Sequence, residues 1–133
     1  MTSLVQDDTA LRALCARLAG GAWIALDTEF MRVKTYRARL CLLQVATPEL
    51  VMCVDPLAVS IEPLLDVLYD SHTLKVLHAA RQDLEVFFDI RQAVPTPVFD
   101  TQIAAALTGY DDQIGYGALV EKITGHKLPK ANQ

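Results

Sequence analysis

The sequence predicts an α/β domain whose sheet begins with antiparallel strands and continues with a parallel one. Three short apolar runs follow one another between residues 22 and 54 with brief connections, as in an antiparallel meander. Beyond them, amphipathic helical stretches alternate with one further apolar run. No internal repeat, low-complexity tract or linker is visible, so we expect a single domain over residues 1–133.

Composition narrows the class of protein. The chain is 52% hydrophobic and 21% charged, which suits a globular domain with its own core. No apolar run approaches the roughly 20 residues of a membrane helix, and the N-terminus lacks the pattern of a signal peptide. The isolated Cys15, Cys41 and Cys53 indicate reduced thiols rather than disulfides or a zinc site. We therefore expect a cytoplasmic protein, monomeric and without membrane contact.

The first half of the chain predicts one helix and three strands. Apolar residues recur at helical spacing over residues 8–19, where Asp8 or Thr9 can cap the start and Gly20-Gly21 follows the end. The run from Ala22 reads as a strand buried on both faces. Two more strands are expected over 40–46 and 50–54, joined by a tight turn and therefore antiparallel.

The second half predicts four helices and one strand. The leucine spacing over 61–69 indicates a helix with Pro63 in its first turn, and a short strand over 73–77 follows. The helix over 79–91 is expected to bury Ala80, Leu84, Phe87 and Phe88. Asp100 is most simply the N-cap of a helix ending near Leu107, and a last helix spans 116–124.

Two acids at the end of the first strand are the main chemical signal. Side chains alternate along a strand, so Asp27 and Glu29 share a face while Thr28 takes the other. Adjacent carboxylates repel each other and lose solvation, and a divalent metal commonly offsets that cost. The simpler alternative is two acids at a strand end that meet solvent.

A third acid and a basic segment lie where they can join this pair. Asp83 is near the start of the helix over 79–91 and can reach over the strand that carries Asp27 and Glu29. Three carboxylates converging there would suit Mg²⁺ or Mn²⁺. The segment 30–39 holds four cations and no acid. These cations can meet phosphates or form a solvated charged loop. The net charge of −4 argues against coating of nucleic acid by bulk charge but does not exclude a local basic patch.

Several segments together resemble ribonuclease D, in the order in which that family has them. They are Leu26-Asp-Thr-Glu-Phe30, Thr35-Tyr36, the Leu-x-Leu-x-Gln run ending at Gln44, Val54-Asp-Pro-Leu57, His78-Ala-Ala-Arg-Gln-Asp-Leu-Glu-Val86 and Phe99-Asp-Thr-Gln102. The resemblance implies a ribonuclease H-like fold and membership of the DEDD 3′→5′ exonucleases.

The resemblance also implies a mechanism and a site. Asp27, Glu29 and Asp83 become catalytic acids that bind two divalent ions, Mg²⁺ or Mn²⁺, for hydrolysis at an RNA 3′ end. Transfer RNA precursors are the substrates that the family implies. The expected substrate-binding residues, which surround these acids, are Phe30, Arg32, Lys34, Thr35, Tyr36 and His78. Phe30 can equally stack on a base or belong to the core. For His78 a structural or indirect role is favoured over direct metal ligation, because hard Mg²⁺ sites seldom use imidazole.

One family motif has no match. The family uses a Tyr-x-x-x-Asp on a later helix, but neither Tyr110 nor Tyr116 has an Asp four residues on. We therefore expect residues 1–133 to be the N-terminal part of an exonuclease domain, without the third motif and the C-terminal helical RNA-binding domains, and weakly active or inactive. The alternatives are a non-catalytic RNA- or protein-binding module on the same fold, and a DNA-directed proofreading exonuclease. The latter would share the acids but not the Thr35-Tyr36 and Gln44 surroundings.

Overall fold

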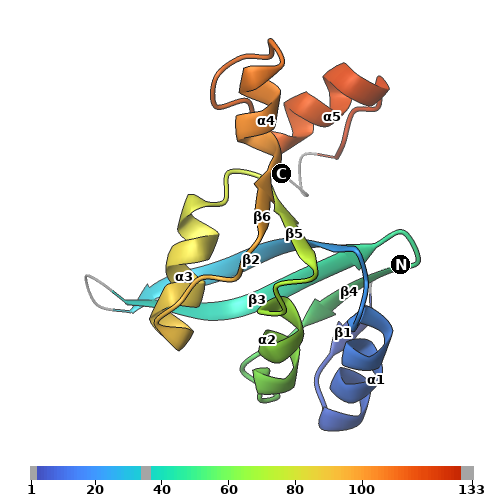
Figure 1. Ribbon diagram of the computed structural model, residues 1–133, viewed down its shortest axis with the longest axis vertical. Coiled ribbons are helices and arrows are strands. Elements are labelled where there is room, and N and C mark those ends of the chain that lie inside the picture. Colours follow the sequence, from blue (N-terminus) through green and yellow to red (C-terminus); the bar gives the residue numbers. More distant parts are fainter. Residues whose placement is uncertain (1–2, 34–36, 130–133) are drawn as a thin grey trace.

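The computed structural model describes residues 3–33 and 37–129 and contains one mixed sheet with helices (Figure 1). The strands are β1 (Ser3–Val5), β2 (Trp23–Val33), β3 (Arg37–Thr47), β4 (Leu50–Val54), β5 (Leu74–Leu77) and β6 (Val98–Asp100). The helices are α1 (Asp8–Leu18), α2 (Glu62–Leu68), α3 (Arg81–Arg91), α4 (Thr101–Leu107) and α5 (Tyr116–Thr124). None of the helices in these residues has the length and apolar character needed to cross a membrane.

The sheet has the predicted combination of antiparallel and parallel pairs. Its strand order is β1-β4-β3-β2-β5-β6, with β3 antiparallel to both of its neighbours, β2 and β4, and β5 parallel to β2. The edge strands β1 and β6 were not expected from the sequence. Each is three residues long, too short to show a period, and each pairs in parallel with its neighbour.

One face of the sheet carries the main core. Ile24 and Leu26 of β2 are buried there together with residues of α1, α2 and α3, so these three helices cover this face. Alternate residues of β2 turn to the opposite face, where Trp23 remains 39% exposed. The prediction that this strand is buried on both faces was therefore wrong. The helices α4 and α5 lie beyond the ends of β5 and β6 and share a smaller core of Ala105, Ile114 and Leu119 (Figure 1).

Local sequence signals explain most of the helix ends. The N-cap of α1 is Asp7, whose carboxylate accepts from the Ala10 amide at 2.8 Å, one residue before the expected cap. Asp100 caps α4 as predicted. Gly125 ends α5 in the left-handed conformation that glycine adopts without strain. On α3, Phe87 is buried as expected, whereas Phe88 is 47% exposed. The expectation for Phe88 was wrong because it lies beyond the covered stripe of the helix.

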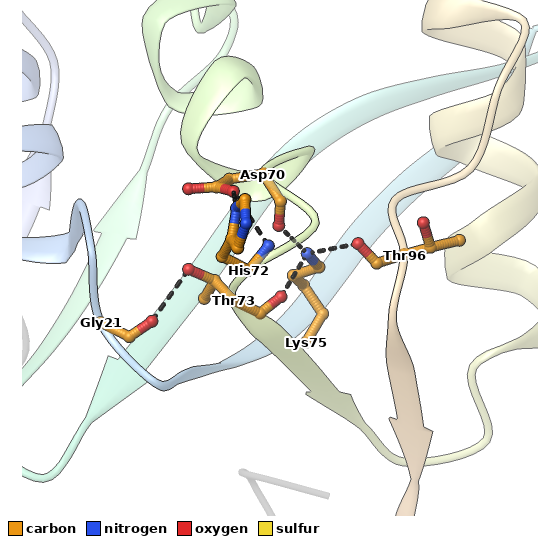
Figure 2. A network of polar contacts seen from close by, with 6 residues as sticks. All are labelled: Gly21, Asp70, His72, Thr73, Lys75 and Thr96. Carbon is orange, nitrogen blue, oxygen red and sulfur yellow. Dashed lines mark hydrogen bonds and ion pairs between the residues drawn. The ribbon is translucent and has the colours of Figure 1, made fainter.

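A buried lysine ties β5 to the segments on either side of it (Figure 2). The Lys75 side chain is fully buried, and its ammonium donates to the carbonyl oxygens of Asp70 (2.7 Å), Thr96 (2.9 Å) and Thr73. Burial lowers the pKa of Lys75, and the nearby negative charge of Asp70 opposes that shift. The three carbonyls satisfy the ammonium, so the lysine joins the turn before β5 to the loop before β6.

Replacing this lysine should destabilise the fold strongly. Lys75→Met withdraws the donors from three carbonyl oxygens, so we expect the free energy of unfolding to fall by about 3 kcal/mol in urea denaturation. Lys122→Met is the control, since Lys122 makes only an exposed ion pair with Asp111 at 3.7 Å. Its cost should stay below about 1 kcal/mol. Equal falls in the free energy of unfolding in the two variants would show that the Lys75 hydrogen bonds stabilise the fold no more than an exposed ion pair does.

Candidate active site

The register of the sheet fixes where the two acids of β2 point. Asp27 pairs with Gln44 of β3, which pairs in turn with Cys53 of β4, and directly paired residues share a face. Thr28 pairs with the buried Leu43 on the face that the helices cover. Asp27 and Glu29 are exposed and Thr28 is buried, as the alternation predicted. The expectation that the acids end the strand was wrong, because β2 continues to Val33.

Asp83 reaches β2 from the covered side. It lies in the first turn of α3, is only 7% exposed, and its carboxylate accepts from the Thr28 amide at 3.2 Å and from the Thr28 hydroxyl. Among the described residues, β5 pairs with β2 only as far as Ala25. Beyond Ala25 the carboxylate of Asp83, rather than a strand, provides the acceptor for the Thr28 amide. The helix is thereby attached to β2 at the residue between the two acids.

Negative charge accumulates around this contact. Burial raises the pKa of Asp83 above its usual value, the Thr28 hydrogen bonds oppose the rise, and the charge of Asp100 adds to it. The pKa of Asp27 is also raised, first by partial burial and then by the charge of Asp83, against the opposing effect of the Thr28 amide; Glu29 adds a smaller rise. A bound cation would relieve this repulsion because it stabilises the ionised carboxylates.

The donor set fits a hard divalent ion by its chemistry. All three side chains offer carboxylate oxygens, which are the ligands that Mg²⁺ and Mn²⁺ prefer. The structure brings Asp27 and Asp83 within electrostatic reach of each other. Within residues 3–33 and 37–129, no three His, Cys, Asp or Glu side chains are gathered closely enough to hold a metal ion. Asp83 instead engages Thr28.

The residues after the two acids take different positions. Phe30 follows a register shift in the β2–β3 pairing and packs against the main core, as its core interpretation expects. The Arg32 guanidinium lies 5.8 Å from the centre of the Phe30 ring and 3.6 Å from the Glu85 carboxylate, at the surface. Lys34, Thr35 and Tyr36 lie outside the described residues. The substrate-binding role of all five remains a prediction.

His78 is held by contacts within the chain. Its Nδ1 lies 2.8 Å from the Thr101 hydroxyl and its Nε2 lies 2.7 Å from the Ile114 carbonyl oxygen. Its ring also meets Tyr116 edge-on, with 5.7 Å between ring centres. These contacts join the end of β5 to α4 and to the loop before α5. They support the structural interpretation of His78, and its binding of substrate remains a prediction.

Sequence reasoning underestimated three residues around the acids. Thr28 was assigned only to the opposite face, yet it is the partner of Asp83. Gln44 was noted as part of a family-like run, and the register puts it directly beside Asp27. Asp100 was assigned only a capping role, but it also bonds the backbone before α3. The spacing of Thr28 between the acids was the one local signal available, since the other contacts depend on the tertiary fold.

An open hollow of about 890 Å³ lies between α3, β6 and α4. Its walls include the exposed rings of Phe88 and Phe99, and Arg32 and Arg81 line it as well. Glu85 stands 3.6 Å from Arg32 and 3.7 Å from Arg81 in exposed ion pairs. The helix that carries Asp83 therefore also forms one wall of a mostly apolar hollow with cations beside it.

Comparison with known proteins places the chain in a family. A family model described as 3′-5′ exonuclease matches residues 2–133. Ribonuclease D of Jannaschia sp. (strain CCS1) is 47% identical over 129 residues, which are 92% of this chain and 33% of that protein. Ribonuclease D of Nitrobacter hamburgensis is 42% identical over 98% of this chain and 35% of its own length. The chain thus spans about a third of these curated relatives.

A solved structure agrees with this chain in fold. The crystal structure of Escherichia coli RNase D, described as an exoribonuclease involved in structured RNA processing, superposes with a TM-score of 0.89 at 38% identity. The match covers 98% of this chain and 35% of that one. The predicted mixed α/β fold and the predicted resemblance are both confirmed. This chain belongs to the 3′–5′ exonuclease family and is similar within it to ribonuclease D.

Proposed function

We propose that the chain is part of a metal-dependent 3′→5′ exoribonuclease, in which Asp27, Glu29 and Asp83 hold two divalent ions, Mg²⁺ or Mn²⁺. One observation carries the proposal. Asp83 of α3 is bonded to Thr28, the residue between Asp27 and Glu29, so that acids 54 or more residues apart in sequence meet at one strand. Membership of the 3′–5′ exonuclease family supports the same three residues.

The chain's own groups have distinct tasks in this proposal. Asp27 and Glu29 offer exposed oxygens on one face of β2, and Asp83 approaches from the other side of the strand. Thr28 keeps Asp83 in place through its amide and hydroxyl. When bound, two divalent ions supply an activated water and stabilise the attacking and leaving oxygens of a phosphodiester.

An RNA 3′ end is the proposed substrate. The E. coli relative is described as acting in structured RNA processing, and the family resemblance suggests transfer RNA precursors. Arg32 supports this choice because its ion pair with Glu85 is exposed and contributes little, so a phosphate can replace the carboxylate at small cost. We propose Phe30, Lys34, Thr35, Tyr36 and His78 as the remaining candidates for the substrate groove, in a monomeric cytoplasmic enzyme.

Binding of metal should depend on the three acids. In a Mn²⁺ titration followed by electron paramagnetic resonance, we expect Asp27→Asn, Glu29→Gln and Asp83→Asn each to weaken binding about tenfold or more. Asp112→Asn is the matched control, since Asp112 is an exposed acid of the loop before α5. Equal affinity in wild type and Asp27→Asn would remove the proposed site.

The same acids should make metal-free stability depend on pH. Since the folded state raises the pKa of Asp27 and Asp83, it binds more protons than the unfolded state above the ordinary Asp pKa of about 4. Their contribution to stability is therefore full below that pH and is lost as the pH rises through the folded pKa. Asp27→Asn should flatten this fall in urea denaturation, while Asp112→Asn should leave it. An unchanged slope in Asp27→Asn would contradict the raised pKa of Asp27.

The 133 residues alone should degrade RNA weakly or not at all. They supply three of the four acids that the family resemblance requires, and none of their tyrosines has an Asp four positions later. Incubation with Mn²⁺ and a 5′-labelled RNA should leave the 3′ end nearly intact. Full turnover would overturn this expectation. Tight RNA binding that neither Mn²⁺ nor Asp27→Asn changes would favour the alternative of a non-catalytic binding module.

A further inference from the structure

The carboxylate of Asp100 makes more hydrogen bonds than a helix cap needs. Its Oδ1 accepts from the amides of Gln102 (2.9 Å) and Ile103 (3.4 Å), which is the capping arrangement for α4. The same carboxylate accepts from two amides about 20 residues earlier. The Ala79 amide donates to Oδ1 at 2.9 Å and the Ala80 amide to Oδ2 at 2.8 Å. Asp100 therefore joins the start of α4 to the turn that precedes α3.

That turn has no local means of holding its shape. Ala79 has a φ of +56°, a left-handed conformation that costs free energy for any residue with a side chain. Ala80 is the N-cap of α3 and, as an alanine, supplies no side-chain cap to the helix. A conformation of this kind persists where its surroundings fix it. The two hydrogen bonds that the Asp100 carboxylate accepts fix both amides of the turn.

The conformation of this turn determines the position of the Asp83 carboxylate. Asp83 lies three residues after Ala80, so the direction in which α3 begins determines where its carboxylate arrives. The position of this carboxylate is tightly constrained, because it must accept from both the amide and the hydroxyl of Thr28. We propose that Asp100 is a positioning residue for Asp83, which acts by holding the Ala79–Ala80 turn and touches neither metal nor RNA. Its consequence for metal binding rests on the function proposed above.

The test changes Asp100 and observes Thr28. In Asp100→Ser the shorter side chain can still cap α4 but no longer reaches Ala79 and Ala80. Asp7→Ser is the matched control, because Asp7 caps α1 by the same kind of bond to Ala10. Asp83→Ala gives the reference signal for a Thr28 amide that has lost its acceptor. The readouts are the ¹⁵N–¹H chemical shift and the hydrogen exchange of the Thr28 amide, in protein without metal.

We expect Asp100→Ser to move the Thr28 signal toward its position in Asp83→Ala and to speed Thr28 exchange about tenfold or more. Leu43, opposite Thr28 on β3, should remain protected, and Asp7→Ser should leave the Thr28 signal in place. Asp100→Asn should cause a smaller change in the same direction, because an amide nitrogen then faces the Ala80 amide. A wild-type Thr28 signal in a folded Asp100→Ser protein would overturn the proposal. So would unfolding of both Asp100 variants with Asp7→Ser folded, since Asp100 would then support the fold as a whole.

A Mn²⁺ titration of the same variants separates this inference from the proposed function. Because the Thr28 readout needs no metal, a positioning role is supported by a displaced Thr28 signal even if wild type binds no Mn²⁺. Absence of Mn²⁺ binding by wild type would contradict only the proposed metal site. If wild type binds Mn²⁺, Asp100→Ser should bind it about tenfold more weakly while Asp7→Ser binds as wild type does. Wild-type affinity in Asp100→Ser would show that positioning of Asp83 does not matter for the metal.

Discussion

The contact between Asp83 and Thr28 is the constraint on which the candidate site depends. A strand edge that has lost its neighbour leaves amides without acceptors, and burying such an amide is costly. Here β5 stops pairing with β2 at Ala25, and a carboxylate from the first turn of α3 takes over at Thr28. The same bond that satisfies the strand brings a third acid to a strand that already carries two. The contact between Asp83 and Thr28 therefore serves both the fold and the proposed chemistry.

Such an arrangement concentrates negative charge in a partly buried place. The pKa values of Asp27 and Asp83 are both raised, chiefly by burial, and Asp27 is raised further by Asp83 itself. A protein that needed only to cap a strand edge could use a neutral side chain there. A bound cation would offset the repulsion among three carboxylates near one strand. Membership of the 3′–5′ exonuclease family and the local electrostatics therefore support the same proposal.

Sequence patterns predicted what depends on neighbouring residues and missed what depends on distant ones. Alternation along the strand was enough to place Asp27 and Glu29 on one face, and the short turn after β3 was enough to predict antiparallel pairing. The role of Thr28, the second role of Asp100 and the position of Gln44 beside Asp27 all arise from partners in other elements. No period in the chain encodes them. Phe88 was expected in the core because helical spacing identifies an apolar stripe but not how much of that stripe the sheet covers. The strands β1 and β6 are too short for any pattern to appear.

The central claim, that Asp27, Glu29 and Asp83 hold divalent ions, is tested most directly by locating the metal. Crystals of the chain grown with MnCl₂ and measured at the manganese absorption edge would give anomalous peaks at bound Mn²⁺. We predict a peak for a Mn²⁺ ion coordinated by the oxygens of Asp27, with Glu29 or Asp83 as a second ligand. This peak should be lost in Asp27→Asn crystals. A peak that lies elsewhere and persists in Asp27→Asn, with all three carboxylates free of metal, would contradict the claim.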